Sequence, residues 1–175
     1  MRLLILFILL LSSISYADNT SVEVIGGSIT YHVMDDGASS HYATKWSSDG
    51  RLIFNQLYGV KLLVKDNDSY SSMTYFGGNN SIGSPIYGGI VSYGVILKDF
   101  NVGLAIGGYM QDDNAFRSVG VEPYRLTEIG SSGLVPVVGV EINYKVDLSD
   151  TMYLKLNNLL SPVITNTSLS LGFNL

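Results

Sequence analysis

The residues of this 175-residue chain whose types could support acyl transfer are two histidines, His32 and His41, and the adjacent pair Asp68 and Ser69. An imidazole can take the proton of an attacking hydroxyl while a carboxylate supports the imidazole, so these residue types are the parts of a nucleophilic site. Asp68 is the preferred carboxylate because it directly precedes Ser69, and Asp66 is the alternative. Ser and Asp are also common in solvated loops, where they bond their own backbone. The spacing alone therefore favours a loop and a histidine without a catalytic role.

The composition excludes several other kinds of chemistry. The chain has no cysteine, which removes thiolate nucleophiles, thiolate metal sites and disulfides. Its formal net charge of −5 argues against nucleic-acid binding. The acidic run Asp112-Asp113-Asn114, with Glu122, lacks the ligand spacing of a calcium loop, and we interpret it as a solvated outer loop. The sequence contains no phosphate-binding glycine motif, and we expect neither a metal nor a cofactor.

The N-terminal residues are typical of an exported protein. Met1-Arg2 precede an unbroken apolar run, Leu3–Leu11, and the small residues of Ser15-Tyr16-Ala17 suit a cleavage site. We expect residues 1–17 to be a cleaved signal peptide and residues 18–175 to form one domain. The chain is 46% hydrophobic and 14% charged, against about 25% charged for an average soluble protein. Such a chain has either a large soluble core or an outer surface that faces lipid.

Alternation of apolar and polar residues with period two organises the chain. Val138, Val140 and Ile142, for example, alternate with Gly139 and Glu141. A soluble sandwich would bury the apolar face, whereas a barrel would turn it to lipid and turn the polar face to the lumen. The signal peptide and the alternating C-terminal segment favour the barrel, so we predict an all-β fold: a single transmembrane antiparallel up-and-down β-barrel of outer-membrane type. Its eight predicted strands span residues 22–34, 41–47, 51–65, 85–97, 100–111, 134–147, 151–159 and 163–175.

Short and long connections alternate between the predicted strands. The short ones lie at residues 47–50, 98–99 and 147–150, and the others at residues 34–40, 66–84, 112–133 and 161–162. Outer-membrane barrels have short periplasmic turns and longer outer loops, so we place both termini in the periplasm. On this topology His32 faces the lumen near the outer end of the first strand, and Asp68 and Ser69 lie in the loop after the third strand. We therefore predict that His32 and Ser69 share the extracellular rim.

Several segments resemble the PagP family of lipid A palmitoyltransferases, which are eight-stranded outer-membrane barrels. The likeness runs thinly over most of residues 18–175, and it depends on the order of the segments rather than on any single motif. The segments are Ile29-Thr30-Tyr31-His32, Lys45-Trp46 followed by Gly50, Leu57-Tyr58 followed by Lys65-Asp66-Asn67-Asp68-Ser69-Tyr70, Pro85-Ile86-Tyr87-Gly88, and Asp113-Asn114.

The resemblance implies an enzyme that moves a palmitoyl chain from a phospholipid to a hydroxyacyl chain of lipid A without a cofactor. It implies catalytic roles for His32, Asp68 and Ser69, and it puts the acyl chain in the upper barrel beside Gly88 and Ile90. We accordingly expect a monomer embedded in the outer membrane of a Gram-negative bacterium, with phospholipid and lipid A as its partners and no nucleic acid.

The chain also departs from the family pattern. The family has Lys-Asp-Ser where this chain has Asn67-Asp68 inserted between Asp66 and Ser69. The family is also rich in tryptophan, whereas Trp46 is the only tryptophan of this chain. Ile90 stands where the family has its chain-length glycine, so we predict a shallower pocket and a donor chain shorter than palmitoyl, or no acyl binding. A deacylase of another barrel family is disfavoured because no histidine follows His41. Two functions stay open: an acyltransferase, and a non-catalytic barrel whose surface loops bind or block a partner.

Overall fold

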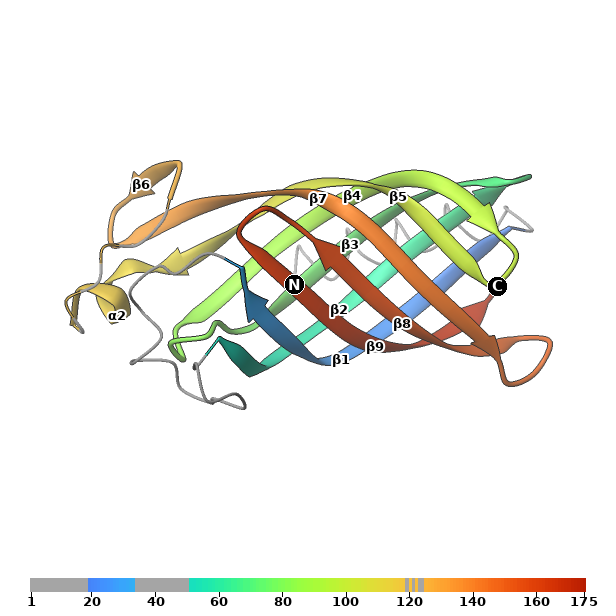
Figure 1. Ribbon diagram of the computed structural model, residues 1–175, viewed down its shortest axis with the longest axis horizontal. Coiled ribbons are helices and arrows are strands. Elements are labelled where there is room, and N and C mark those ends of the chain that lie inside the picture. The colour runs from blue at the N-terminus through green and yellow to red at the C-terminus, as the bar shows by residue number, and fades with distance from the viewer. Residues whose placement is uncertain (1–18, 34–50, 119, 121, 123–124) are drawn as a thin grey trace, which may run out of the picture.

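Eight long strands form one closed antiparallel barrel (Figure 1). The computed structural model describes residues 19–33, 51–118, 120, 122 and 125–175. Strands adjacent along the barrel wall pair with each other, β5 pairs with β7, and β1 pairs with β9, so the ring is complete. The predicted fold class is confirmed. The barrel strands are β1 (Thr20–His32), β2 (Leu52–Asp66), β3 (Ser69–Asn79), β4 (Pro85–Leu97), β5 (Phe100–Asp112), β7 (Ser132–Asp147), β8 (Met152–Leu160) and β9 (Ile164–Asn174).

The segment between β5 and β7 carries two smaller elements, helix α2 (Asp113–Ser118) and strand β6 (Thr127–Ile129). β6 forms a hairpin with the first residues of β7, which extends beyond the end of β8. Arg117 of α2 donates a hydrogen bond to Glu128 of β6, and this bond and its positive charge hold the pKa of the Glu128 carboxyl below its ordinary value. Among the described residues, no helix has the length and hydrophobicity needed to cross a bilayer.

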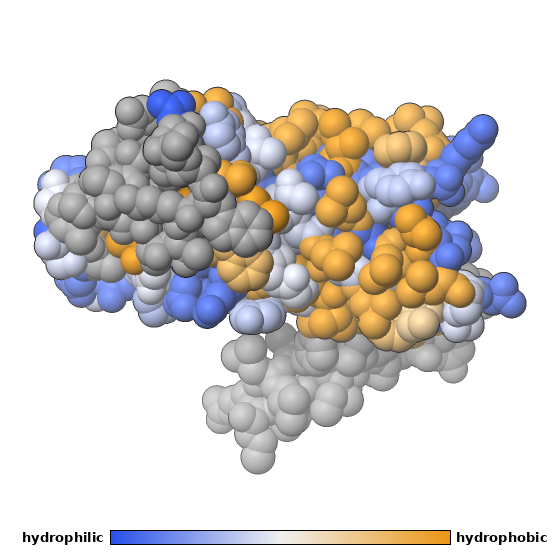
Figure 2. Space-filling model, turned by 60° about the horizontal axis from the view of Figure 1, so that its bottom comes forward, coloured by the Kyte–Doolittle hydropathy of each residue, from blue (hydrophilic) through white to orange (hydrophobic). Residues whose placement is uncertain are grey.

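The strands put apolar side chains outside and polar side chains inside. On β7, Val138 is 60% exposed and Val140 37% exposed, while Glu141 and Asn143, farther along the same strand, point inward and are buried. Figure 2 shows apolar residues over much of the barrel wall on the face drawn, with hydrophilic residues at its ends. A soluble sandwich would have the reverse distribution, so this is the arrangement of a barrel whose wall faces lipid.

The two ends of the barrel differ in their connections. One end, here called the turn end, has the start of β1, the end of β9, and short turns at residues 67–68, 98–99 and 148–151. The opposite end, here called the loop end, has the connections at residues 33–51, 80–84, 113–131 and 161–163. The short turns predicted at residues 98–99 and 147–150 are confirmed, as is the longer connection predicted at residues 112–133, whereas the turn predicted at residues 47–50 lies outside the described residues. Figure 1 also shows β4, β5 and β7 reaching farther toward the loop end than the β8–β9 hairpin does.

The predicted loop at residues 66–84 is wrong, because most of it is strand β3. Asn67 has a φ of 52°, a left-handed conformation that Asn adopts readily, and it forms a two-residue turn with Asp68 that reverses the chain into β3. The Ser- and Gly-rich composition of β3 obscured its alternation: Tyr70 and Thr74 point inward and Met73 points outward. The predicted strand at residues 41–47 lies outside the described residues, and the barrel closes with eight strands because β3 is one of them.

A β-bulge in β1 decides which side chains enter the barrel. Gly27 has a φ of 70°, and the pairing register shifts between Gly26 and Ser28 against both neighbouring strands. In a regular strand, residues separated by an odd number of positions face opposite sides. Glu23 and His32 are nine positions apart and are nevertheless both buried on the inner face. The bulge therefore brings His32 into the same interior as Glu23.

Candidate functional site

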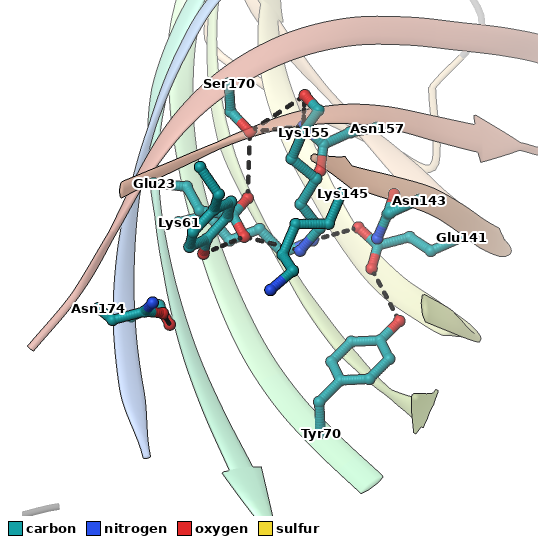
Figure 3. A network of polar contacts seen from close by, with 12 residues as sticks. Glu23, Lys61, Tyr70, Glu141, Asn143, Lys145, Lys155, Asn157, Ser170 and Asn174 are labelled. Atoms are coloured by element: carbon teal, nitrogen blue, oxygen red, sulfur yellow. Dashed lines mark hydrogen bonds and ion pairs between the residues drawn. The ribbon is translucent and has the colours of Figure 1, made fainter. Parts of the chain in front are cut away.

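Two ion pairs fill the half of the barrel that lies toward the turn end. Lys155 Nζ lies 2.7 Å from Glu23 Oε1, and Lys61 Nζ lies 2.8 Å from Glu141 Oε1. The four side chains come from β8, β1, β2 and β7, and each residue is at most 7% exposed. Figure 3 shows them pointing toward one another inside the barrel. Since the two acids and two bases balance, the cluster, here called the plug, carries no net charge.

Two tyrosines complete the plug. Tyr153 donates a hydrogen bond of 3.0 Å to Glu23, and Tyr70 donates one of 3.3 Å to Glu141. Glycine makes room for each ring, on the adjacent strand β9 for Tyr153 and on β5, two strands away, for Tyr70. A Cβ on Gly172 would lie 2.2 Å from Tyr153 Cζ, and one on Gly103 would lie 2.6 Å from the Tyr70 hydroxyl oxygen. An eight-stranded barrel is just wide enough to be filled by side chains, and here they fill it.

A cavity of about 160 Å³ lies between the plug and the loop end. Lys61, Glu141 and Asn157 line its floor, so the plug closes it from below. The cavity has one apolar wall, formed by β3, β4, β5, β7 and the end of β8. The opposite wall is largely uncharged and polar, and it is formed by β9, β1 and β2. The apolar wall consists of Phe76, Ile86, Ile90, Tyr109, Val137 and Leu159, and the polar wall carries Ser28, Thr30, His32, Asn55, Asn166 and Ser168.

Hydrogen bonds between neighbouring strands hold the polar wall in place. Asn55 donates a bond of 2.7 Å to Thr30 Oγ1, and Asn166 donates bonds of 2.8 Å to Thr30 Oγ1 and 3.1 Å to Ser28 Oγ. Asn55 lies opposite Ser28 in the strand register, and Ser28 lies opposite Ser168. The wall is therefore a continuous row of amides and hydroxyls that runs across three strands.

His32 lies at the loop-end mouth of this cavity. It is 8% exposed, and its Nε2 lies 3.1 Å from Ser81 Oγ in the β3–β4 connection. That connection is braced by Asn80 Oδ1, which accepts hydrogen bonds from the backbone N–H groups of Ile82 and Ser84 at 3.1 and 2.9 Å. The pair of a hydroxyl and an imidazole has the components of proton transfer, and it sits where a ligand would enter.

The structure does not bring the predicted site residues together. His32 is at the loop end, whereas Asp68 and Ser69 form the β2–β3 turn at the turn end, where Ser69 Oγ donates a hydrogen bond of 2.9 Å to the Asp66 carbonyl. The length of β2 separates them, roughly 46 Å along the strand at about 3.3 Å per residue. The prediction that His32 and Ser69 share a rim is wrong, because the segment interpreted as an outer loop is a turn followed by β3. The alternative carboxylate, Asp66, is at the same far end.

The other predicted residues have mixed outcomes. Ile90 lines the cavity, as expected from its inward parity on β4. Gly88 instead serves strand packing, since a Cβ there would lie 2.4 Å from the Gly108 carbonyl oxygen and 2.6 Å from Tyr109 Cβ. His41 lies outside the described residues. Within the described ranges, no group of three or more His, Asp or Glu side chains is arranged to hold a metal ion.

Sequence reasoning missed Ser81, Asn55 and the role of Glu23. The inward parity of Lys61, Glu141 and Lys155 was readable from the alternation, and Glu23 lies between Val22 and Val24 in the same kind of pattern. Ser81 had no comparable signal, because its contact with His32 joins the β3–β4 connection to the end of β1, 49 residues away in the sequence.

No protein-family model matches this sequence, and no curated protein matches it significantly. Several solved barrels are similar in structure. The N-terminal β-barrel domain of Pseudomonas aeruginosa OprF aligns at 13% identity with a TM-score of 0.44, covering 89% of this chain and 97% of that chain. Neisserial surface protein A aligns at 11% identity with a TM-score of 0.46 and the same coverages, and the attachment invasion locus protein Ail of Yersinia pestis at 10% with a TM-score of 0.41, covering 88% and 95%. We base the assignment of function on the chain's own geometry.

Proposed function

We propose that this chain is a non-conducting outer-membrane barrel that binds the hydrocarbon part of an amphiphile in the cavity at its loop end. The apolar outer wall supports the membrane location. The start of β1 and the end of β9 lie at the end of the barrel that carries the short turns, which in outer-membrane barrels is the periplasmic end, so the loop end is extracellular.

The observation that carries the proposal is the blind cavity itself. Its floor is the fully paired plug, so a molecule that enters from the loop end cannot pass through. Apolar cavities of about 150 Å³ bind small hydrocarbons, and burying a methylene is worth about 0.8 kcal/mol. A volume of about 160 Å³ therefore suits a short stretch of alkyl chain better than a long one.

A cavity-filling variant tests the proposal. Ile90→Trp places a larger ring among the lining residues and is expected to abolish retention of a decanoic acid probe by the full chain in lipid nanodiscs. Val91→Trp, on the same strand but 46% exposed on the outer wall, is the matched control and is expected to retain the probe. Methyl chemical shifts of Ile86 report occupancy. Equal binding by both variants would show that the probe lies outside the barrel.

A second candidate is acyl transfer of the PagP type, and the His32–Ser81 contact of 3.1 Å favours it. In that reaction the hydroxyl of the acceptor lipid would attack the ester carbonyl of a phospholipid whose acyl chain lies in the cavity. His32 would take the hydroxyl proton and return it to the departing lysophospholipid oxygen, so that one ester forms as the other breaks. Asp68 and Ser69 take no part in this version of the site.

The acyl-transfer candidate is tested by mass spectrometry of lipid A from Gram-negative cells that express the chain. Added acyl mass with the parent, and its loss in His32→Ala and Ser81→Ala, would establish the reaction. Unchanged lipid A in the presence of the folded parent would leave ligand binding without transfer.

A further inference from the structure

The polar wall and floor of the cavity contain two buried amide oxygens that have no hydrogen-bond partner among the described residues. They are Asn55 Oδ1 and Asn157 Oδ1. Asn55 is 6% exposed and Asn157 is 9% exposed, and both line the cavity. A buried acceptor left without a donor is costly, so such atoms in native proteins are usually satisfied by water or a ligand.

The amide nitrogens of the wall and floor each donate to a neighbouring hydroxyl. Asn55 Nδ2 donates to Thr30, Asn166 Nδ2 donates to Thr30 and Ser28, and Asn157 Nδ2 donates to Ser170 Oγ at 2.9 Å. The atoms of Asn55 and Asn157 that are left without a partner are therefore both acceptors. The two charged residues of the floor, Lys61 and Glu141, are paired with each other at 2.8 Å.

We infer that the cavity selects an amphiphile whose inserted chain carries a hydroxyl group, which donates a hydrogen bond to Asn55 Oδ1. This inference rests on the proposed ligand-binding function and adds the chemical class of the ligand. An uncharged donor fits the wall because the cavity has no unpaired charge among its described residues to receive an ionised group. A carbonyl at the same place on the chain has no donor, so it cannot satisfy Asn55 Oδ1.

The position of Asn55 sets the depth of the hydroxyl. Its cross-strand partner, Ser28, lies four residues before His32, about 13 Å along β1 at 3.3 Å per residue. A chain whose polar head stays beside His32 would therefore bring an inner carbon, rather than the carbons next to the head, to Asn55. Selectivity should depend on where along the chain the hydroxyl is placed.

The experiment compares three kinds of probe on the full chain in lipid nanodiscs: decanoic acid, its isomers with a hydroxyl on successive carbons from 5 to 10, and the matching oxo acids. Binding is read from the methyl shifts of Ile86 and Ile90. We expect one inner hydroxyl isomer to bind about three- to tenfold more tightly than decanoic acid, the range of one net hydrogen bond, and its oxo partner to gain nothing.

Asn55→Leu is expected to erase the advantage of the hydroxyl isomer while decanoic acid still binds. Phe54→Leu, its outward neighbour on β2, is the control and should keep the advantage. The inference would be overturned if decanoic acid and all of its hydroxylated isomers bound with equal affinity, or if an oxo acid bound most tightly. Either result would still support the proposed binding function. Methyl shifts that respond to no probe would instead overturn the binding function. If Asn55→Leu does not fold, the hydroxyl and oxo probes on the parent still decide the question.

Discussion

The two halves of the barrel interior are built from the same eight strands, yet one is filled and the other is hollow. In the turn-end half, long charged side chains meet at the axis, and tyrosine rings lie against glycines of other strands. In the loop-end half, the side chains of β1 and β9 include the short Ser28, Thr30 and Ser168, and Ser28 and Thr30 bond sideways to Asn166 instead of reaching across.

The number of strands therefore sets the largest possible interior of the barrel, and the length of the inward-facing side chains decides how much of that interior stays open. A Lys–Glu pair spans the interior from β2 to β7, strands that are not neighbours in the wall. A Ser or Thr at a similar position leaves the opposite wall without a partner. The same barrel width therefore gives a rigid plug at one level and a ligand-sized cavity at another.

The largest effect is expected from breaking the plug. Glu141→Gln leaves the Lys61 ammonium buried without its counter-charge, which typically costs about 3–5 kcal/mol in the free energy of unfolding. Reversible urea unfolding in lipid vesicles measures it. The double variant Lys61→Met with Glu141→Leu removes both charges and should recover most of the loss; a double variant as unstable as the single one would contradict the assignment of the pair as a balanced unit.

The next effect tests the outer wall that both halves share. Ile106 is 60% exposed at the middle of β5, and Ile106→Arg should cost about 2–4 kcal/mol in a bilayer. Leu97→Arg, at the turn-end limit of β4, is the control and should cost about 0–1 kcal/mol because it lies near the interface. The same vesicle unfolding measures both. Equal costs at the two depths would argue that this wall does not face lipid.

A smaller effect is expected from overfilling the plug. Gly172→Ala puts a methyl group 2.2 Å from the Tyr153 ring, and such overpacking typically costs about 1–3 kcal/mol. Gly26→Ala is the matched control, because a Cβ there meets nothing within 4 Å. We expect a lower urea midpoint for the first variant and a near-parental midpoint for the second. Identical midpoints would mean that the Tyr153 ring moves aside freely.

The smallest effect is expected from adding volume to the hollow half. Ile90→Phe enlarges a side chain that borders the cavity, so the free energy of unfolding should change by less than about 1 kcal/mol, below the usual cost of overpacking. Urea unfolding in vesicles, beside Gly172→Ala, compares the two halves directly. A loss as large as that of Gly172→Ala would show that the loop-end half is as tightly filled as the plug.

The amino-acid sequence by itself was enough to predict the barrel, seven of its eight strands, the inward face of Glu141, and the outward face of Val138 and Val140. These properties depend on alternation, which is local: each residue's face follows from its neighbours two positions away. The turns at residues 98–99 and 148–151 were readable for the same reason, since polar reversals such as Lys98-Asp99 are recognised from the residues themselves.

Only the tertiary structure decided which residues meet. The Asn67-Asp68 turn, rather than a long loop, put Ser69 at the turn end, and the bulge at Gly27 put Glu23 and His32 in the same interior. Barrel closure joined Glu23 to Lys155 across 132 residues of chain, and His32 to Ser81 across 49. Contacts of this kind depend on register and closure, which are set by the packing of all strands together, and no local pattern in the sequence encodes them.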